Sequence, residues 1–479
     1  MGKCNREKDL KQNDKMEEEC GIFGIYSPEK RDDIARLNYL GLHALQHRGQ
    51  ESAGICVNND RQLKVHKGMG LVSNVFDKET LKDLTGNISI GHVRYSTTGS
   101  SLLVNAQPLL TNSIKGDLAL AHNGNLINGQ ELKDNLESHG SIFHSTLDTE
   151  VIAHLVARSF KDDIIEALMQ SLQQIKGAFS LIAMTNDSLI AARDPHGFRP
   201  LVLGKKDDSF ILSSETCAFD IIDAEFMREI EPGEVLIINQ EGITSKRYSE
   251  DKTKAFCVFE FIYFARPDSI IGGENVYLAR KKMGRRLAKE MNIEADLVVP
   301  VPSSGMAAAQ GYSLEAGISY ADGILRNRYV GRTFIQPTQE MRDLKVRMKL
   351  NPINKILEGK DIILVDDSIV RGTTSKQIIN RLKETDVNKI HMAIASPPVK
   401  HPCFYGLDTS RRQELIAREK EVEEIAEYIG ADSLHYLSLE GILSVLEADD
   451  YGYCSACFNG KYPTDENEKR EVDKNGFIL

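Results

Sequence analysis

Two adjacent acids, Asp366 and Asp367, stand between a short apolar run and a loop rich in hydroxyl groups. The apolar run, 362–365, is typical of a buried parallel strand, and a pattern with the period of a helix follows the loop. A loop and a helix start at the carboxyl end of a strand offer backbone N–H groups and a favourable dipole to a phosphate. The two acids suit a pair of sugar hydroxyls or a hydrated Mg²⁺. Alternatively, they are a solvated pair of acids at the end of a strand.

The full string from Lys360 to Thr374 closely resembles the phosphoribosylpyrophosphate loop of the type I phosphoribosyltransferases. This resemblance implies that Asp366 and Asp367 hold the ribose hydroxyls, and that the loop after them binds the 5-phosphate of the substrate. The loop residues expected to bind substrate are Ser368, Arg371, Gly372, Thr373 and Thr374.

Two other segments are expected to contribute to the same site. The loop 302–305 follows a predicted strand and contains Ser304, which could reach a metal ion or pyrophosphate. The segment 326–349 is rich in positive charge although the protein is acidic. It is either a solvated surface or a lid that closes over pyrophosphate and keeps water from the activated sugar. As a lid, it would bring Arg332 and Lys349 to the substrate.

Cys20 indicates a second kind of chemistry. It stands where a charged leader gives way to the alternating apolar residues of a predicted strand, 20–26. Such a cysteine could be an ordinary core residue. If the leader 1–19 is removed, however, the α-amine of Cys20, with a reference pKa of about 8, lies beside its own thiol and can act as the base. Three glutamates separate Met16 from Cys20, so methionine removal cannot make this terminus and we expect a self-catalysed cleavage.

Three strings resemble the glutaminase domain of the class II amidotransferases, which are N-terminal-nucleophile hydrolases; they span residues 47–54, 91–97 and 120–126. The resemblance implies that Asn123 and Gly124 form an oxyanion hole, in which each donor is worth roughly 3 to 4 kcal/mol. It also implies that Arg94 binds the α-carboxylate of glutamine and that Asp148 binds its ammonium. From the residues alone, Asn123-Gly124 could instead be a hairpin turn, and Asp148 could cap a helix.

Four cysteines fall late in the chain, at positions 257, 403, 454 and 457. A single C-x-x-C string, such as Cys454 to Cys457, is a weak metal signal, and lone cysteines are usually small buried residues. Taken together, Cys257, Cys403, Cys454 and Cys457 make one possible Cys₄ set, which suits Zn²⁺ or an iron–sulfur cluster.

The bulk properties limit what kind of protein this is. Its 479 residues are too many for one ordinary core and predict two domains. A net charge of −11 argues against a general nucleic-acid or anionic-membrane surface, so we expect neither partner. No apolar run approaches the roughly 20 residues that span a bilayer. Residues 1–19 lack the apolar core of a secretory signal, and eight cysteines without such a signal indicate a reducing, cytoplasmic location.

The elements that must position these residues can be predicted in outline. Apolar runs at 178–184, 209–213 and 234–238 read as strands of a sheet sandwich. The polar stretch from Tyr248 to Lys254 marks a boundary, after which helices and parallel strands alternate. The predicted elements there are a helix from about Val276 to Asn292 and strands at 296–301 and 390–395. We therefore expect a removable propeptide at 1–19, domains at 20–250 and 255–463, and a charged tail at 464–479.

From Cys20 to about Tyr462 the chain resembles the amidophosphoribosyltransferase family, in particular its branch with a leader and an iron–sulfur cluster. The resemblance implies an α+β N-terminal-nucleophile glutaminase sandwich followed by an α/β type I phosphoribosyltransferase domain. It implies one [4Fe-4S] cluster per subunit on the four cysteines, and Mg²⁺ at Ser304, Asp366 and Asp367. It further implies glutamine and phosphoribosylpyrophosphate as substrates, purine nucleotides as inhibitors, and a homotetramer.

Two other functions remain open from the sequence. A different class II glutamine amidotransferase, acting on a sugar phosphate, would share the first domain, but the phosphoribosyl loop argues against it. A non-catalytic phosphoribosylpyrophosphate sensor would keep the loop and lose Cys20 or Asn123, whereas both are present. Coupled release of glutamate and pyrophosphate distinguishes the enzyme from the sensor.

Overall fold

The computed structural model describes residues 20–59, 62–95, 101–251, 253–327, 350–407, 414–446 and 452–464. The predicted leader, the predicted tail after Thr464 and the lid residues 328–349 lie outside these ranges, and Arg332 and Lys349 lie outside them as well.

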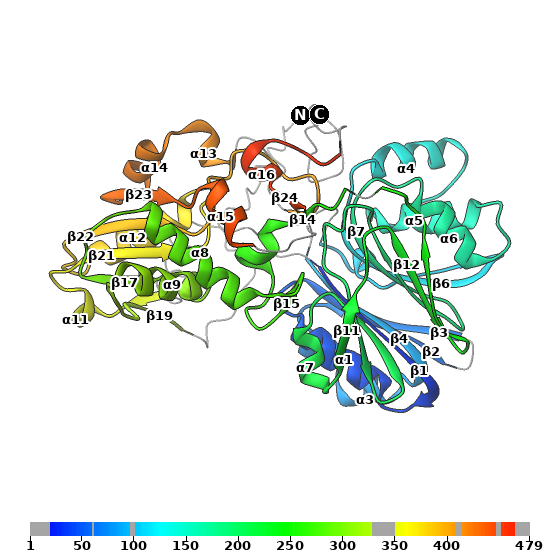
Figure 1. The fold of residues 1–479 in the computed structure, drawn as a ribbon. Coiled ribbons are helices and arrows are strands. Elements are labelled where there is room, and N and C mark those ends of the chain that lie inside the picture. The colour runs from blue at the N-terminus through cyan, green and yellow to red at the C-terminus, as the bar shows by residue number, and fades with distance from the viewer. Residues whose placement is uncertain are drawn as a thin grey trace, which may run out of the picture.

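Two antiparallel sheets packed face to face form the first half of the chain (Figure 1). The strand order is β11-β9-β10-β1-β4-β2-β3 in one sheet and β13-β12-β8-β7-β6-β5 in the other. The first sheet consists of β1 (Gly21–Arg31), β2 (Ser52–Asn59), β3 (Gln62–Met69), β4 (Gly86–Arg94), β9 (Val202–Lys206), β10 (Ser209–Ser213) and β11 (Glu225–Glu229). The second consists of β5 (Leu109–Ser113), β6 (Gly116–Leu126), β7 (Gly177–Met184), β8 (Leu189–Arg193), β12 (Glu234–Asn239) and β13 (Gly242–Arg247). The sandwich and its predicted strands are confirmed.

The alternation of side chains along β1 buries this strand on both faces. Ile22 and Tyr26 lie in the core between the sheets, whereas Phe23 and Ile25 lie in a core shared with the helix α1 (Ile34–Ala44). The helices therefore form outer layers, and the first domain has four layers. The first sheet is covered by α1, α2 (Val72–Val75), α3 (Lys78–Lys82) and α7 (Cys217–Ile222), and the second by α4 (Gly129–Ser138), α5 (Thr149–Arg158) and α6 (Ile164–Leu172).

A five-stranded parallel sheet, in the order β18-β17-β21-β22-β23, forms the centre of the second half. Its strands are β17 (Leu297–Pro300), β18 (Ser319–Tyr320), β21 (Asp361–Asp366), β22 (Lys389–Ile394) and β23 (Ser433–Tyr436). The helices α8 (Val276–Glu290) and α9 (Met306–Ala316) cover one face, and α12 (Thr373–Lys383) and α14 (Val422–Ile429) cover the other. The predicted alternation of helices and parallel strands is confirmed.

Both faces of β21 are apolar, as a central parallel strand requires. Ile363 and Val365 pack in the core beneath α8 and α9, while Ile362 and Leu364 pack in the core beneath α12 and α14. This burial fixes the carboxyl end of β21, and with it Asp366 and Asp367, at the edge of the sheet where β17 also ends.

Short elements complete the second half. A π-helix, η2 (Glu260–Phe264), follows the first residues after the sandwich, and three two-stranded ribbons lie around the parallel sheet. One ribbon joins β19 (Ile324–Arg326) to β20 (Leu350–Pro352), so the two ends of the predicted lid segment are paired. The others are β14 (Phe256–Cys257) with β24 (Tyr453–Cys454) and β15 (Ile270–Ile271) with β16 (Glu274–Asn275), and the remaining helices are η1 (Leu103–Asn105), α11 (Asn354–Leu357), α13 (Ile416–Glu419), α15 (Leu439–Val445) and α16 (Ala456–Asn459).

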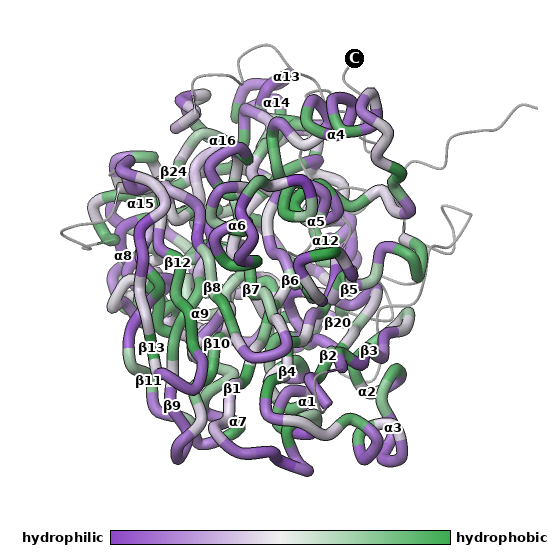
Figure 2. The backbone as a smooth tube through the Cα atoms, turned by 90° about the vertical axis from the view of Figure 1, so that its right-hand side faces the viewer, coloured by the Kyte–Doolittle hydropathy of each residue, from purple (hydrophilic) through white to green (hydrophobic). Residues whose placement is uncertain are grey.

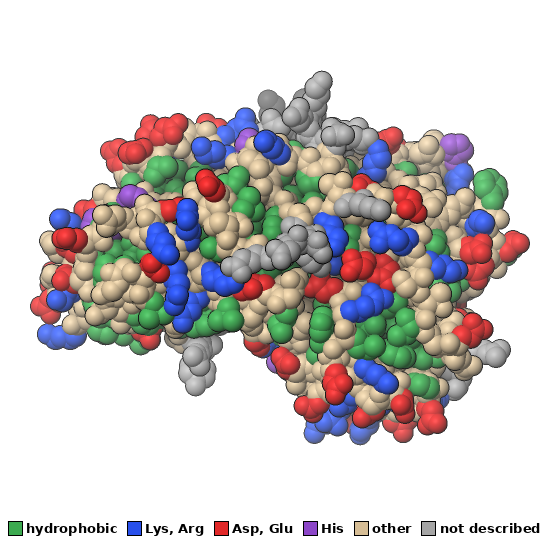
Figure 3. Space-filling view, in the orientation of Figure 1, with side chains coloured by type: hydrophobic (Ala, Val, Ile, Leu, Met, Phe, Trp, Pro, Cys, Tyr) green, Lys and Arg blue, Asp and Glu red, His purple; other side chains and the backbone are tan. Residues whose placement is uncertain are grey.

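Hydropathy follows these layers. Hydrophobic residues run along the inner strands such as β7 and β8, whereas hydrophilic residues dominate the outer turns (Figure 2). On the face shown in Figure 3, acidic and basic side chains are intermingled. Among the described residues, no helix combines the length and apolar character needed to cross a membrane.

Candidate active sites

Cys20 lies at the start of β1, buried at the end of the sandwich. Its Sγ donates to the carbonyl of Tyr95 at 3.5 Å, and its own carbonyl accepts a hydrogen bond from Arg48 Nε at 3.1 Å. The pairing of Gly21 with Val93 places Cys20 next to Arg94 on the neighbouring strand β4. The predicted nucleophile and one predicted glutamine ligand are therefore brought together.

Arg48 belongs to a fully buried group of charges. Its Nη1 donates to Glu215 at 2.6 Å, and its Nη2 donates to Glu260 at 2.8 Å. Arg199 approaches Glu260 at 3.5 Å, and all four side chains are completely buried. Burial alone would raise the pKa of the Glu215 carboxyl, but His47 and Arg48 beside it hold that pKa well below its usual value.

Asn123 and Gly124 lie inside β6, so the hairpin-turn alternative is wrong. Asn123 Nδ2 is buried and has no hydrogen-bond partner among the described residues. Gly124 has φ +146°, and a Cβ there would lie 2.0 Å from the carbonyl oxygen of Ala178. Only glycine fits this backbone, because a side chain would collide with the paired strand β7.

A buried histidine ties the two sheets together at this end of the sandwich. His92, which pairs with Ile22 across β1 and β4, donates from Nε2 to the carbonyl of His122 at 3.0 Å. Burial lowers the pKa of His92 to about 3, so the ring is neutral at ordinary pH. Since His122 directly precedes Asn123, this bond brings the buried amide of Asn123 to the end of the sandwich where Cys20 lies.

The two predicted glutamine ligands are partly engaged by the protein. Arg94 is buried and lies 3.6 Å from Glu51. Asp148 is at the N-cap position of α5, but it makes no side-chain capping bond, so the capping alternative is wrong. Its carboxylate accepts from the N–H of Leu126 at 3.0 Å and lies 3.4 Å from His122. Burial raises the pKa of Asp148, but His122 and these hydrogen bonds outweigh it, so the pKa is lowered.

The second site lies at the carboxyl end of β21. Asp366 and Asp367 are 1% and 2% exposed, so they are not a solvated pair. Ser304 Oγ donates to Asp366 at 3.4 Å, and Ser368 Oγ donates to Asp367 at 2.6 Å. The loop that carries Ser304 can approach so closely because Gly305 has no Cβ, which would lie 2.3 Å from the carbonyl oxygen of Val365.

The loop after the acids leads directly into α12. Gly372 has φ +79° at the N-cap position, and Thr373 and Thr374 form the first turn of the helix. The guanidinium of Arg371 is paired with Glu414 through Nε and Nη2. The loop therefore ends at a helix start, where backbone N–H groups favour an anion, whereas the side chain of Arg371 is held by an acid.

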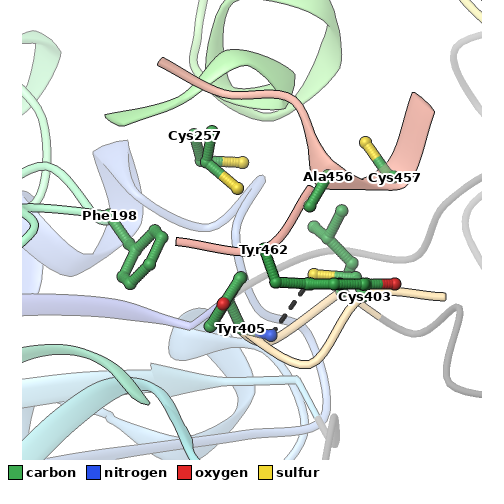
Figure 4. Close-up of a pocket in the computed structure, with 9 residues that line it drawn as sticks. Phe198, Cys257, Cys403, Tyr405, Ala456, Cys457 and Tyr462 are labelled. Carbon is green, nitrogen blue, oxygen red and sulfur yellow. Dashed lines mark hydrogen bonds between the residues drawn. The ribbon is translucent and has the colours of Figure 1, made fainter. Parts of the chain in front are cut away.

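The four late cysteines line one cavity. Figure 4 shows Cys257, Cys403 and Cys457 around it, from three separate segments, with Phe198, Tyr405 and Tyr462 as aromatic walls. All four are free thiols. Burial raises the pKa of the Cys454 thiol to about 12 and that of Cys457 well above its usual value. Among the described residues, no group of three or more His, Cys, Asp or Glu side chains is placed to hold a metal ion.

The segment of Cys403 also contacts the first domain. Asn125, two residues after Asn123, donates to the carbonyl of Phe404 at 2.9 Å, and Arg199 donates to the carbonyl of Tyr405 at 2.6 Å. The rings of Phe198 and Tyr405 stack with their centroids 4.2 Å apart. The cysteine cavity therefore lies against the strand that carries Asn123 and Gly124.

Sequence reasoning missed Glu215, Glu260 and Arg199. The signal for Glu260 was present, because it is the one acid in the otherwise apolar run 255–265 before Arg266, where a buried charge needs a partner. Glu215 carried no such signal, since it stands among hydroxyl-bearing residues that read as a loop.

Two family models match the chain. A glutamine amidotransferase domain matches residues 92–220, and a phosphoribosyl transferase domain matches residues 273–402. The amidophosphoribosyltransferase of Bacillus subtilis is 50% identical over 455 residues, which cover 94% of this chain and 95% of that protein. The amidophosphoribosyltransferase of Methanocaldococcus jannaschii is 48% identical over 465 residues, covering 94% of this chain and 98% of that protein.

Solved structures agree in fold over nearly the whole chain. The glutamine phosphoribosylpyrophosphate amidotransferase of B. subtilis, complexed with ADP and GMP, superposes with a TM-score of 0.89 at 48% identity; the match covers 95% of this chain and 100% of that one. A structure described as the allosteric regulatory enzyme of purine biosynthesis gives a TM-score of 0.90 at 48% identity, covering 95% and 98% of the two chains.

Proposed function

The chain belongs to the amidophosphoribosyltransferase family, and from this premise we propose how its two sites divide the reaction. The enzyme hydrolyses glutamine and transfers the ammonia to C1 of phosphoribosylpyrophosphate. The products are 5-phosphoribosylamine, glutamate and pyrophosphate, in the first step of de novo purine nucleotide synthesis. The observation that carries the assignment of the first site is the buried Nδ2 of Asn123, which has no partner among the described residues and lies at the end of the sandwich where Cys20 lies.

In the first domain, Cys20 Sγ attacks the γ-carboxamide of glutamine after its proton passes to the α-amine of the same residue. That amine exists only after the leader is removed, so the mature chain begins at Cys20. The developing oxyanion accepts from Asn123 Nδ2 and from the N–H of Gly124. The α-ammonium returns its proton to the departing nitrogen, which leaves as ammonia. Water then hydrolyses the γ-glutamyl thioester, releasing glutamate and restoring the thiol. Arg94 and Asp148 bind the α-carboxylate and the α-ammonium of glutamine.

In the second domain, the chain supplies position and charge rather than covalent chemistry. Asp366 and Asp367 accept hydrogen bonds from the ribose hydroxyls. The start of α12, with Ser368, Arg371, Gly372, Thr373 and Thr374, binds the 5-phosphate, and Arg332 and Lys349 contribute from the lid. Mg²⁺, when bound, neutralises charge on the pyrophosphate; the oxygens of Ser304, Asp366 and Asp367 fit a hard cation of this kind.

The four cysteines hold one [4Fe-4S] cluster. A single Zn²⁺, with bonds of about 2.3 Å, would draw its four sulfurs nearly into contact. The four cysteines instead line one shared cavity with aromatic walls, and no described group of His, Cys, Asp or Glu is placed to hold a single ion. Soft thiolates from Cys257, Cys403, Cys454 and Cys457 in an apolar setting suit a cluster that has a structural role.

Further properties are proposed from the family resemblance. They are the domain divisions at 1–19, 20–250, 255–463 and 464–479, a cytoplasmic homotetramer, and inhibition by purine nucleotides. The B. subtilis structure contains ADP and GMP, which supports the proposal of nucleotide inhibition for this chain.

Replacing the proposed nucleophile tests whether glutamine hydrolysis and phosphoribosylamine synthesis take place at two separate sites. We expect Cys20→Ala to abolish glutamine-dependent synthesis and to leave synthesis from added ammonia near the wild-type rate, because the second domain has its own substrate site. Glutamate and pyrophosphate are measured together, and they should appear one-to-one in the wild type. A folded Cys20→Ala protein that lost both activities would contradict the two-site assignment, and a wild-type protein that released neither product would favour the sensor.

A further inference from the structure

We propose that Glu260, a residue of the second domain, is a positioning residue for glutamine hydrolysis in the first. It acts through Arg48, whose Nε donates to the carbonyl of Cys20 at 3.1 Å. The inference rests on the proposed role of Cys20 as the nucleophile. It adds a residue that none of the motifs for glutamine chemistry contains.

The hydrogen bonds of Arg48 show why Glu260 sets its orientation. Nη1 and Nη2 both donate to Glu260, at 3.0 Å and 2.8 Å, whereas Glu215 accepts from Nη1 alone. A bidentate pair fixes the plane of a guanidinium, which a single hydrogen bond does not. Nε lies in the same plane, so Glu260 also fixes the direction of the bond to Cys20.

Burial makes this arrangement rigid. The side chains of Arg48, Glu215, Glu260 and Arg199 have no exposed surface, and the two arginines balance the two acids. In such a group, removing one partner leaves a buried charge without compensation, and the remaining side chains must rearrange. Loss of the Glu260 carboxylate would therefore turn the guanidinium of Arg48 toward Glu215 and away from Cys20.

Glu260 is itself held by the second domain. It is the first residue of η2, and the buried side chain of Arg280 on α8 donates to the carbonyls of Phe261 and Ala265 at 2.7 Å and 2.9 Å. Arg280 also lies close enough to Asp367 for the acid to oppose the lowering of its pKa by burial. The backbone that presents Glu260 is thus attached to the helix that supports the second site.

An acid of the first domain also binds groups of the second domain. Glu215 of the first domain accepts from the N–H of Arg266 at 2.8 Å and from Ser269 Oγ at 2.6 Å. Each of the two acids therefore binds groups from the other domain. These reciprocal contacts fix the position of one domain relative to the other. Glu260 can therefore orient Arg48 toward Cys20 only when the two domains are in contact.

The test separates positioning from substrate binding. In Glu260→Gln we expect kcat for glutamine hydrolysis to fall about 10-fold or more, since small misplacements of a reacting group cost rates of this order. We expect KM for glutamine to change by less than about two-fold, because Glu260 acts on Cys20 through Arg48 and not on the proposed glutamine ligands. Synthesis from added ammonia should keep the wild-type rate, and Glu260→Asp should recover part of the lost kcat.

Glu234→Gln is the matched control. Glu234 is also a buried acid bound by both outer nitrogens of an arginine, Arg228, but all its side-chain hydrogen bonds stay within the first domain, to Arg228, Ser245 and the N–H of Glu231. Glu234→Gln should leave both glutamine hydrolysis and synthesis from ammonia unchanged. A wild-type kcat in Glu260→Gln, an equal fall in both activities, or a rise in KM alone would overturn the inference. If Glu260→Gln does not fold, Glu260→Asp is measured in the same assay. A wild-type kcat in Glu260→Asp would then overturn the inference.

Cys20→Ala separates this inference from the proposed function. If that variant still hydrolysed glutamine, the nucleophile would be assigned wrongly and the proposed function of the first site would fail. If Cys20→Ala is inactive while Glu260→Gln keeps the wild-type kcat, only the role of Glu260 fails.

Discussion

At the scale of single residues, Asn123 shows how a side chain can be held ready for a reaction. Its Nδ2 is buried and has no partner among the described residues, and a buried donor without a partner costs about 1 to 3 kcal/mol of folding stability. In the proposed role, this donor gains its partner as negative charge develops on the substrate oxygen, so the interaction favours the transition state over the ground state.

Asn123→Ala is therefore expected to lower kcat for glutamine hydrolysis by roughly 10² to 10³, as for other oxyanion-hole donors, with little change in KM. The melting temperature should not fall, because no side-chain hydrogen bond of Asn123 to a described residue is lost. Asn128 is the control: it is buried and satisfied by Lys176 and Gln174, so Asn128→Ala should reduce the melting temperature and spare kcat. The reverse pattern would mean that Asn123 is a structural residue.

Glu215 gives the protein a specific sensitivity to acid. Its pKa is lower in the folded protein than the ordinary value of about 4.5, because His47 and Arg48 stabilise the charged form. A carboxyl with a lowered folded pKa contributes stability above its unfolded pKa, and that contribution is lost as the pH falls below it. We expect the melting temperature to fall more steeply between pH 5 and pH 3, about the range of this transition, in the wild type than in Glu215→Gln. Glu166→Gln, which removes an exposed carboxyl, is the control. An equal dependence of melting temperature on pH in Glu215→Gln and the wild type would contradict the lowered pKa of Glu215.

At the scale of elements, the second site depends on where strands end. The period of the apolar residues predicted β21, β22 and α12, and the motif predicted the loop between β21 and α12. These signals are local in the sequence and could be read from it. The partners of Arg48 could not be predicted from the sequence. Glu215 and Glu260 follow Arg48 by 167 and 212 residues, and no local pattern specifies that pairing. The same reason explains why Glu414 was not expected beside Arg371.

The double change Asp366→Asn with Asp367→Asn tests whether the two carboxylates at the end of β21 take part in phosphoribosylamine synthesis. Removing both charges should abolish phosphoribosylamine formation from glutamine and from ammonia, while some glutamine hydrolysis remains. Asp361→Asn, at the opposite end of β21, changes the same chemical group away from the site and should keep both activities. Wild-type synthesis in the double variant would show that the acids have no part in the reaction.

At the scale of the whole molecule, the cysteines join segments that are far apart in the chain. Cys257 and Cys454 lie opposite one another in the parallel pair β14 and β24, and the N–H groups of Lys400 and His401 donate to the carbonyl of Cys457. A cluster bound here would close one loop of more than 100 residues, between Cys257 and Cys403, a restraint on the order of 4 kcal/mol in the cross-link model. The sequence predicted the set of four through the family resemblance, and the aromatic wall from Phe198 was not predicted.

Substituting any one of the four by Ser should reduce the yield of folded protein rather than only a rate. Protein purified without air should contain four irons and four sulfides per chain, as the proposed [4Fe-4S] cluster requires, and exposure to air should inactivate it. Cys56→Ser, in the sandwich core, is the control and should not change the iron content. Stoichiometric zinc without sulfide would replace the cluster by a Cys₄ zinc site, and a metal-free, active and stable protein would leave the four as ordinary core thiols.

The long separation between Arg48 and Glu260 has a consequence for the newly made chain. Glu260 leaves the ribosome 212 residues after Arg48, roughly 10 to 40 s later at 5 to 20 residues per second. Phe404, which accepts a hydrogen bond from Asn125, follows Asn125 by 279 residues and emerges later still. The first half is translated first, yet Cys20, its proposed nucleophile, and the strand that carries Asn123 receive their last supports from the half translated second. A polysome-bound fragment therefore cannot consume glutamine efficiently before the site that uses the ammonia has been made.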